Sequence, residues 1–275
     1  MSAASPAWIT NARMYAVTPG VEAGWRDLIA RIADEAGVPL GYLPYPAPAP
    51  LEALWQREDL GAVFMCGYPI VLGLAPVVPL AAPVPRAAWA QGRPRYRSDL
   101  IVRTDAPFRS LEDTFGMRAG WTVEHSHSGF NAFRHHLLGF RTPARPALYG
   151  AVTGHLVTAR NILDSVREGR IDVGPLDAYW HLLIRRHAPE LTAGVRTLAS
   201  TALAPIPAFV AAPGLPATAV ARLKAAFAAA AGREWFGPLG ELLSLDGFEP
   251  VTAADYAPLG DWDREARAAG YLLPA

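Results

Sequence analysis

The sequence predicts an α/β fold, because short apolar segments that suit strands alternate with segments whose apolar residues recur at helical spacing. The clearest helix spans 22–36 and ends at Gly37. Trp25, Leu28 and Ile32 share one face of this segment, as expected for a helix packed on a sheet. The chain has 275 residues, of which 51% are hydrophobic and 18% charged, so it can bury a sizeable core.

In the first half of the chain, strands and short helices are expected to alternate. The expected strands are 12–17, 40–45, 62–66, 98–103 and 118–123. After the helix 22–36, further helical segments are expected at 51–58 and 110–115. Segment 44–50 is rich in proline and is predicted to be an extended connector. Prolines also interrupt the apolar stretch 71–84 and are expected to cut a helix short there.

The second half continues the alternation. A helix is expected to begin at Ser128 or Gly129. Later helices are expected at 158–168, 178–187, 217–230 and 256–269. The expected strands are 171–174, 196–199 and 206–210, and 235–248 is predicted to be irregular or helical.

Composition excludes several function classes. Lys+Arg and Asp+Glu number 25 each, and this balance argues against broad nucleic-acid binding. The single cysteine, Cys66, cannot form an internal disulfide and is expected to be a buried thiol. No apolar run is long enough to predict a transmembrane helix. Residues 1–6 have neither the basic nor the apolar region of a secretory signal, so both a cytoplasmic and an exported protein stay open.

The most informative segment is Glu124–Asn131, between the expected strand 118–123 and the following helix. Its Ser126-His127-Ser128-Gly129 turn leaves backbone N–H groups at the positive end of a helix dipole. Such a turn binds phosphate, sulfonate or carboxylate groups without needing a lysine. The alternative is that Ser128 is only an N-cap.

Other polar or aromatic side chains follow predicted strands, and ligands bind at the carboxyl ends of strands in open α/β sheets. They are Tyr68, Tyr96, His155 and Asp177. Each also has a purely structural interpretation. The tyrosines suit a core or wall, His155 a surface or cap, and Asp177 the N-cap of a helix that starts at Ala178.

Common catalytic and metal-binding templates are not met. The sequence has no Gly-x-Ser-x-Gly elbow, no P-loop and no Gly-x-Gly-x-x-Gly fingerprint. His125 and His127 lack a partner at metal-ligand spacing. His135 and His136 are adjacent in an expected helix and point apart, so they cannot share one ligand. No metal or cofactor is therefore expected.

A series of short motifs, taken in order, resembles a known family. These motifs are Cys66-Gly67-Tyr68-Pro69, Leu80–Val84, Tyr96–Arg103, Ser110–Asp113, Ser126–Ala132, Thr153-Gly154-His155, Gly169–Val173 and Asp177. They resemble the phosphonate-type (phosphate, phosphite or phosphonate) substrate-binding proteins of ABC transporters, from about residue 12 to 210. The resemblance implies the type II periplasmic-binding-protein fold, in which two α/β lobes joined by a two-segment hinge close on a ligand.

The resemblance also implies where the lobes lie. Lobe 1 is expected to comprise 1–103 plus 200–275, and lobe 2 to comprise 104–199. The two hinge crossings are expected near 103–104 and 199–201.

The resemblance assigns the anionic head of the ligand to the turn. Ser126, Ser128 and the N–H groups of Gly129 and Phe130 are implied to hold it, and His155 to donate a further hydrogen bond. Neutral donors at a helix terminus suit a tetrahedral oxyanion.

Five further residues complete the implied site. Tyr68 and Tyr96 are expected to contact the ligand, and Tyr15 is a weaker candidate. Asp177 is expected to face a cationic part of the ligand, such as an amine. His127 stands where the family often has a small or amide residue, and is expected to enlarge the polar wall or to favour a different ligand.

These residues predict a monomeric solute receptor that binds a small oxyanion and has no catalytic activity. It would be periplasmic if exported, and its closed form would dock on an ABC permease in the membrane. One alternative is a cytoplasmic lyase or biosynthetic enzyme on the same fold, with His127 or His155 as the acid/base and Asp177 as its partner. Another is a ligand-sensing domain. The identity of the ligand stays open.

Overall fold

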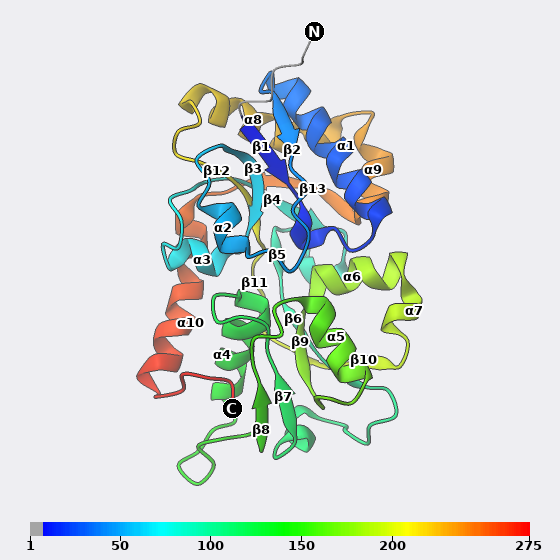
Figure 1. The fold of residues 1–275 in the computed structure, drawn as a ribbon, viewed down its shortest axis with the longest axis vertical. Coiled ribbons are helices and arrows are strands. Elements are labelled where there is room, and N and C mark those ends of the chain that lie inside the picture. Colours follow the sequence, from blue (N-terminus) through cyan, green and yellow to red (C-terminus); the bar gives the residue numbers. More distant parts are fainter. Residues whose placement is uncertain (1–7) are drawn as a thin grey trace. The chain divides into compact units, whose positions relative to one another are not determined.

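The structure is a computed structural model and describes residues 8–275. Internal contacts divide the chain into two compact units (Figure 1). Unit 1 comprises residues up to 95 together with 205–256, and unit 2 comprises 96–204 together with 257–275. The expected lobes, 1–103 plus 200–275 and 104–199, follow the bounds that the resemblance implies. That division stays a prediction.

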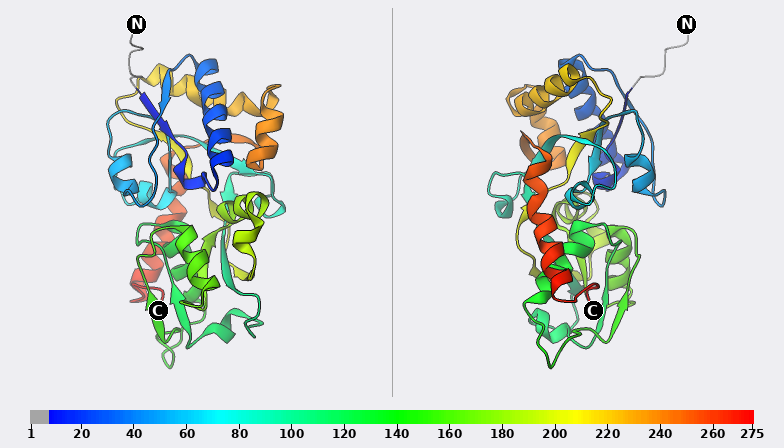
Figure 2. Two further views of the ribbon diagram at one scale, coloured as in Figure 1. Left: turned by 45° about the vertical axis from the view of Figure 1, so that its right-hand side comes forward. Right: turned by 90° about the vertical axis from the view of Figure 1, so that its left-hand side faces the viewer.

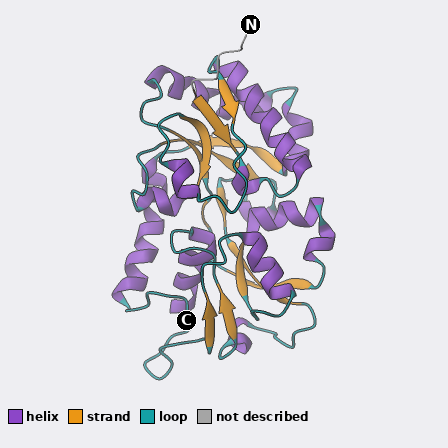
Figure 3. Cartoon of the chain, in the orientation of Figure 1, coloured by secondary structure: helices purple, strands orange, loops and turns teal. Residues whose placement is uncertain are grey.

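Unit 1 is built around a six-stranded sheet of order β13-β4-β12-β3-β1-β2 (Figure 3). Its strands are β1 Trp8–Asn11, β2 Leu40–Tyr42, β3 Leu60–Met65, β4 Val78–Pro85, β12 Ala208–Ala211 and β13 Leu245–Pro250. The neighbours β2, β1 and β3 run parallel, whereas β12, β4 and β13 pair antiparallel. All six residues of β3 are buried, as expected for a strand in the middle of a covered sheet.

The helices of unit 1 pack on this sheet. They are α1 Pro19–Ala36, α2 Leu51–Trp55, α3 Gly67–Val71, α8 Ala217–Ala229 and α9 Phe236–Leu243, with the 3-10 turns η1 Arg13–Tyr15, η2 Ala88–Ala90, η5 Ala230–Gly232 and η6 Ala253–Tyr256. Helices α1, α8 and α9 lie side by side (Figure 2). Thr18 caps α1, and Gly37 ends it at φ 60°, which favours glycine. In the core, Phe64 stacks on Phe209 with ring centroids 3.9 Å apart.

One predicted strand of unit 1 is wrong, and strand β4 was not predicted. The first strand is not 12–17 but Trp8–Asn11, and Arg13–Tyr15 forms a 3-10 turn. The proline-interrupted stretch contains the eight-residue strand β4. Its prolines, at 79, 83 and 85, all stand at odd-numbered positions. The N–H groups that they lack would point to one edge of the strand, so the N–H groups on the other edge can still donate hydrogen bonds.

Unit 2 contains two small sheets. The antiparallel one has the order β10-β6-β9, with β6 Ser98–Arg103, β9 Gly174–Asp177 and β10 Val195–Ser200. The parallel one joins β7 Arg118–Gly120 to β8 Ala151–Thr153. The short strands β5 Arg95–Tyr96 and β11 Ala204–Pro205 pair with each other. The strand predicted at 171–174 is wrong, because β9 begins only at Gly174.

The helical elements of unit 2 include the one that follows the Ser126 turn. They are η3 Leu111–Thr114, η4 His127–Asn131, α4 Ala132–Leu138, α5 Ala159–Arg167, α6 Ala178–His187, α7 Pro189–Thr192 and α10 Ala257–Ala268. Element η4 is a π-helical turn that continues directly into α4. Helix α10 packs along η4 and α4 (Figure 2). Phe133 and Leu137 are buried within unit 2.

Within residues 8–275, no helix combines the length and the apolar character needed to cross a membrane. The segment 1–6, for which no secretory signal is expected, lies outside the described residues.

Candidate functional site

The Ser126 turn has the geometry of a helix N-terminus. Ser126 is the N-cap, and its Oγ accepts a hydrogen bond of 3.0 Å from the N–H of Gly129. Its carbonyl oxygen accepts one of 3.0 Å from the N–H of Asn131. The first N–H groups of a helix lack intrahelical acceptors and face any anion placed there. The N–H of Gly129, however, is already bound by Ser126.

Close packing against the end of β7 fixes this turn. The N–H of Thr122 donates to the carbonyl oxygen of Gly129 at 3.1 Å. A Cβ atom on Gly129 would lie 2.0 Å from Thr122 Oγ1, a distance that no side chain can tolerate. Glycine at 129 is therefore required by packing against Thr122, a contact that a linear motif does not reveal.

Ser98, at the start of β6, supports the turn from the neighbouring sheet. Its Oγ donates to the carbonyl oxygen of Ser128 at 2.8 Å, and its N–H donates to Thr201 Oγ1 at 2.9 Å. Ser98 also pairs with Asp177 in the β6–β9 ladder. Within the described part of the chain, the half-buried hydroxyl of Ser128 makes no hydrogen bond, so it is available to a ligand.

His155 lies on an exposed loop that is anchored to the same region. The loop is held by a 3.2 Å hydrogen bond from the N–H of Leu156 to the carbonyl oxygen of Trp121. The His155 ring packs against the Trp121 indole at 4.9 Å, and its Nε2 lies 4.0 Å from Glu124 Oε1. The side chain is 70% exposed, so solvent and small solutes reach it. Sequence reasoning missed Trp121, which belongs to no binding motif, and gave no role to Glu124, although Glu124 begins the segment 124–131.

His127 occupies a different environment, although it stands between the two serines. It is 1% exposed, and its ring packs near Tyr96 and Trp262, with centroid distances of 6.0 and 5.2 Å. Its Nδ1 lies 3.3 Å from Asn131 Nδ2. Burial, with a smaller contribution from His135, lowers the pKa of His127 to about 3. Its imidazole is therefore neutral near pH 7, which does not suit the acid/base role considered for it.

Asp177 performs the capping role that its position suggests. Its Oδ1 accepts hydrogen bonds from the N–H groups of Tyr179 and Trp180, at 2.9 and 3.0 Å. These bonds cap α6, and the residue is 9% exposed. Its role toward a ligand cation stays a prediction.

Eight of the ten predicted site residues belong to unit 2, and Tyr15 and Tyr68 belong to unit 1. Both tyrosines are 1% exposed, as is Tyr96. The Tyr15 ring meets Phe64 edge-on at 5.0 Å, within the core of unit 1. The roles of these tyrosines in ligand binding stay predictions.

Helix α10 supports the turn from behind, which the sequence did not indicate. Arg134 is 1% exposed, forms an ion pair with Asp263, and donates to Asn131 Oδ1 at 3.0 Å. Asn131 Nδ2 in turn donates to the carbonyl oxygen of Leu259 at 2.9 Å. The helix that begins at the Ser126 turn is thus joined to α10 by buried polar contacts.

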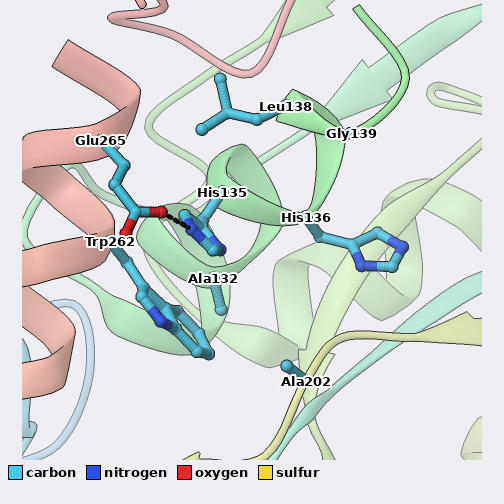
Figure 4. Close-up of a pocket in the computed structure, with 8 residues that line it drawn as sticks. All are labelled: Ala132, His135, His136, Leu138, Gly139, Ala202, Trp262 and Glu265. Carbon is cyan, nitrogen blue, oxygen red and sulfur yellow. Dashed lines mark hydrogen bonds and ion pairs between the residues drawn. The ribbon is translucent and has the colours of Figure 1, made fainter. Parts of the chain in front are cut away.

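A pocket of about 370 Å³ lies along the seam between α4 and α10 (Figure 4). It is lined by Ala132, His135, His136, Leu138, Gly139, Ala202, Trp262 and Glu265. His135 stacks on Trp262 at 4.7 Å, and its Nε2 lies 2.6 Å from Glu265 Oε2, whereas His136 points away (Figure 4). None of the predicted site residues lines this pocket. Among residues 8–275, no group of three or more His, Cys, Asp or Glu side chains is placed to hold a metal ion.

Comparison with known proteins identifies the family. Residues 18–256 match the family described as ABC transporter, phosphonate, periplasmic substrate-binding protein. A search of curated proteins finds no match.

Several solved structures share the fold at low sequence identity. A binding-protein component of an ABC phosphonate transporter from Pseudomonas aeruginosa is 14% identical, with a TM-score of 0.79 over 96% of this chain and 88% of that one. PhnD1 from Prochlorococcus marinus, solved with methylphosphonate, is 15% identical, with a TM-score of 0.76 over 94% and 98%. A Xanthomonas citri protein bound to ATP is 20% identical, with a TM-score of 0.65 over 97% and 98%.

The predicted type II periplasmic-binding-protein fold is confirmed by these structures. The predicted family is confirmed by the match over 18–256, and its members bind substrates rather than transform them. The enzyme alternative has no support. This chain belongs to the family of periplasmic substrate-binding proteins of phosphonate ABC transporters.

Proposed function

We propose that this chain binds a small phosphonate-like oxyanion at the Ser126 turn and delivers it to the membrane permease that its family serves. The observation that carries the proposal is the capped helix N-terminus at Ser126, on which the Ser128 hydroxyl has no hydrogen-bond partner among residues 8–275. His155 is exposed on a loop anchored to the neighbouring Trp121. Hydroxyl, N–H and imidazole donors on one unit suit the oxygens of a tetrahedral anion.

The phosphonate class is favoured over other anions by the family and by one structural relative. The family matched is that of phosphonate transporters, and PhnD1 of Prochlorococcus marinus was solved with methylphosphonate. Within this proposal, Ser126, Ser128, Phe130 and His155 supply donors, whereas the N–H of Gly129 serves mainly to fix the turn. His127 is 1% exposed and is proposed to shape the turn from the interior, and its contribution to the polar wall stays a prediction.

The other expected contacts form part of the same proposal. Tyr15, Tyr68 and Tyr96 would contact the ligand when the lobes 1–103 plus 200–275 and 104–199 close, and Asp177 would meet a ligand amine. We propose that the receptor acts as a monomer in the periplasm and does not bind nucleic acid. The equal numbers of acidic and basic residues support the last point.

Calorimetric titration tests the proposal. The purified chain is titrated with methylphosphonate, phosphate, phosphite, a sulfonate and small carboxylates. We expect micromolar or tighter binding of one phosphorus oxyanion, weakened roughly tenfold or more in Ser128→Ala and His155→Ala, because each removes a hydrogen bond to a charged group.

The matched control is Ser110→Ala. Ser110 caps η3, away from the turn, so this variant loses a serine hydrogen bond without touching the site. Absence of binding by the wild-type chain to every anion, or equal affinities in all variants, would contradict the proposal.

A further inference from the structure

We infer that Glu124 is a specificity-determining residue of the oxyanion site. Its carboxylate disfavours doubly charged anions and so favours singly charged ones. The inference rests on the proposed function of the Ser126 turn. Its basis is the position of the Glu124 carboxylate, 4.0 Å from Nε2 of His155 and two residues before Ser126. Glu124 and His155 are both exposed, at 62% and 70% of their side chains.

The Glu124 carboxylate offsets the charge of the one basic side chain among the proposed donors. If His155 is protonated, the pair is neutral. If it is not, the pair contributes one negative charge. In neither state does the pair offer a net positive charge to a ligand.

The arginines near this region are already paired, including Arg97, whose Nε lies 3.5 Å from Asp99 Oδ1. Arg118, on β7, is bound to Asp172 through two hydrogen bonds of 2.9 Å. Arg134, whose guanidinium lies 4.9 Å from the centre of the Phe130 ring, is buried and paired with Asp263. Neutral donors therefore hold the ligand while a carboxylate stands beside it. Each added negative charge on the ligand increases the repulsion from Glu124.

The effect has a predictable size. Because Glu124 is exposed, solvent screens its field. We expect its removal to raise the affinity for a doubly charged ligand, relative to a singly charged one, by about two- to fivefold. A smaller gain in affinity is expected for a singly charged ligand, so the ratio of the two affinities is the informative quantity.

The test compares methylphosphonate, at an alkaline pH where it is doubly charged, with its monomethyl ester, which carries one charge. Both are titrated calorimetrically at low salt into the wild-type chain, Glu124→Gln and Glu190→Gln. Glu190 is an exposed carboxylate of unit 2 on α7, so its variant has the same net charge as Glu124→Gln. We expect Glu124→Gln to raise the affinity for the dianion relative to the monoanion by about two- to fivefold, and Glu190→Gln to leave the ratio unchanged.

The outcomes separate this inference from the proposed function. Binding by the wild type, with the same ratio in both variants, overturns the role of Glu124 and leaves the oxyanion site standing. A lower relative affinity for the dianion in Glu124→Gln also overturns it. Failure of the wild type to bind either probe overturns the site and the inference together.

Discussion

The hydroxyl of Ser98 donates a 2.8 Å hydrogen bond to the carbonyl oxygen of Ser128. Ser98 is 1% exposed and begins β6, whereas Ser128 lies on the turn that opens the helical segment. The bond therefore positions a proposed ligand contact from a rigid strand. Because the acceptor is the carbonyl group, the Ser128 hydroxyl stays available to a ligand.

Replacing Ser98 with alanine is expected to weaken oxyanion binding severalfold and to lower the free energy of unfolding by about 1 kcal/mol. The cause is loss of the bond to Ser128, which leaves a carbonyl oxygen without its partner. Calorimetric affinity and denaturant melts measure the two effects. Ser110→Ala, which removes a cap on η3, should reduce stability without changing affinity. Unchanged affinity in Ser98→Ala would show that the bond does not position the site.

The buried imidazole of His127 should make stability depend on pH. Its pKa is lowered to about 3 in the folded protein, whereas an unfolded histidine titrates near 6.5. Between these two pH values the unfolded chain binds a proton that the folded protein does not. The contribution of His127 to stability is therefore full above about pH 6.5 and declines as the pH falls toward about 3. The free energy of unfolding should fall by up to about 1.4 kcal/mol per pH unit in this window.

His127→Gln removes this titration and keeps a polar side chain near Asn131. Urea melts at several pH values should therefore show a shallower pH dependence in the variant than in the wild type. The comparison of slopes cancels contributions from other groups, such as His136, whose pKa burial also lowers. Identical slopes would contradict a neutral, buried His127.

The Arg134–Asp263 pair should be essential to the stability of unit 2. Asp263→Asn leaves a guanidinium that is 1% exposed without its carboxylate, which is expected to cost about 3–5 kcal/mol. Guanidinium chloride melts measure the loss. Asp261→Asn on the same helix is the control, because it breaks only the exposed pair with Arg264 and should cost less than about 1 kcal/mol. Similar losses in the two variants would refute a special role for the buried pair.

Gly129→Ala should distort the Ser126 turn, since the new methyl group would meet Thr122 Oγ1 at 2.0 Å. We expect a loss of about 1–3 kcal/mol in stability and weaker oxyanion binding. Adding Thr122→Ala should restore part of both, because it removes Oγ1 and Cγ2 but leaves Cβ in contact. Gly139→Ala, at the end of the same helix, has its nearest atom at 3.8 Å and should be tolerated. Equal effects at 129 and 139 would contradict the packing argument.

Sequence reasoning identified the helix at the turn because its signals are local. Ser126 is a capping residue, and the helical segment begins at His127, one residue before the expected Ser128 or Gly129. Helix α6 begins at Ala178 and ends at His187 as predicted, because Asp177 caps it. The strand 98–103 was also correct, although its burial does not alternate, because its first five residues are all buried.

The elements that sequence reasoning missed or misplaced depend on contacts with distant residues. Strand β4 contains prolines and has no local strand signal, yet it pairs with β12 and β13, which come from the far end of the sequence. Trp8–Asn11 is a strand because it pairs with both β2 and β3, whereas the more apolar 12–17 is not.

For the site, the sequence by itself determined the fold class, the family and the turn that bears Ser126 and Ser128, because cap residues and ordered motifs act over a few neighbouring positions. Only the tertiary structure decided which side chains face solvent. It buried His127, exposed His155 beside Glu124, and joined Arg134 to Asp263, 129 residues apart. Burial and ion pairing depend on which distant segments pack together, and the spacing of residues along one segment does not encode that.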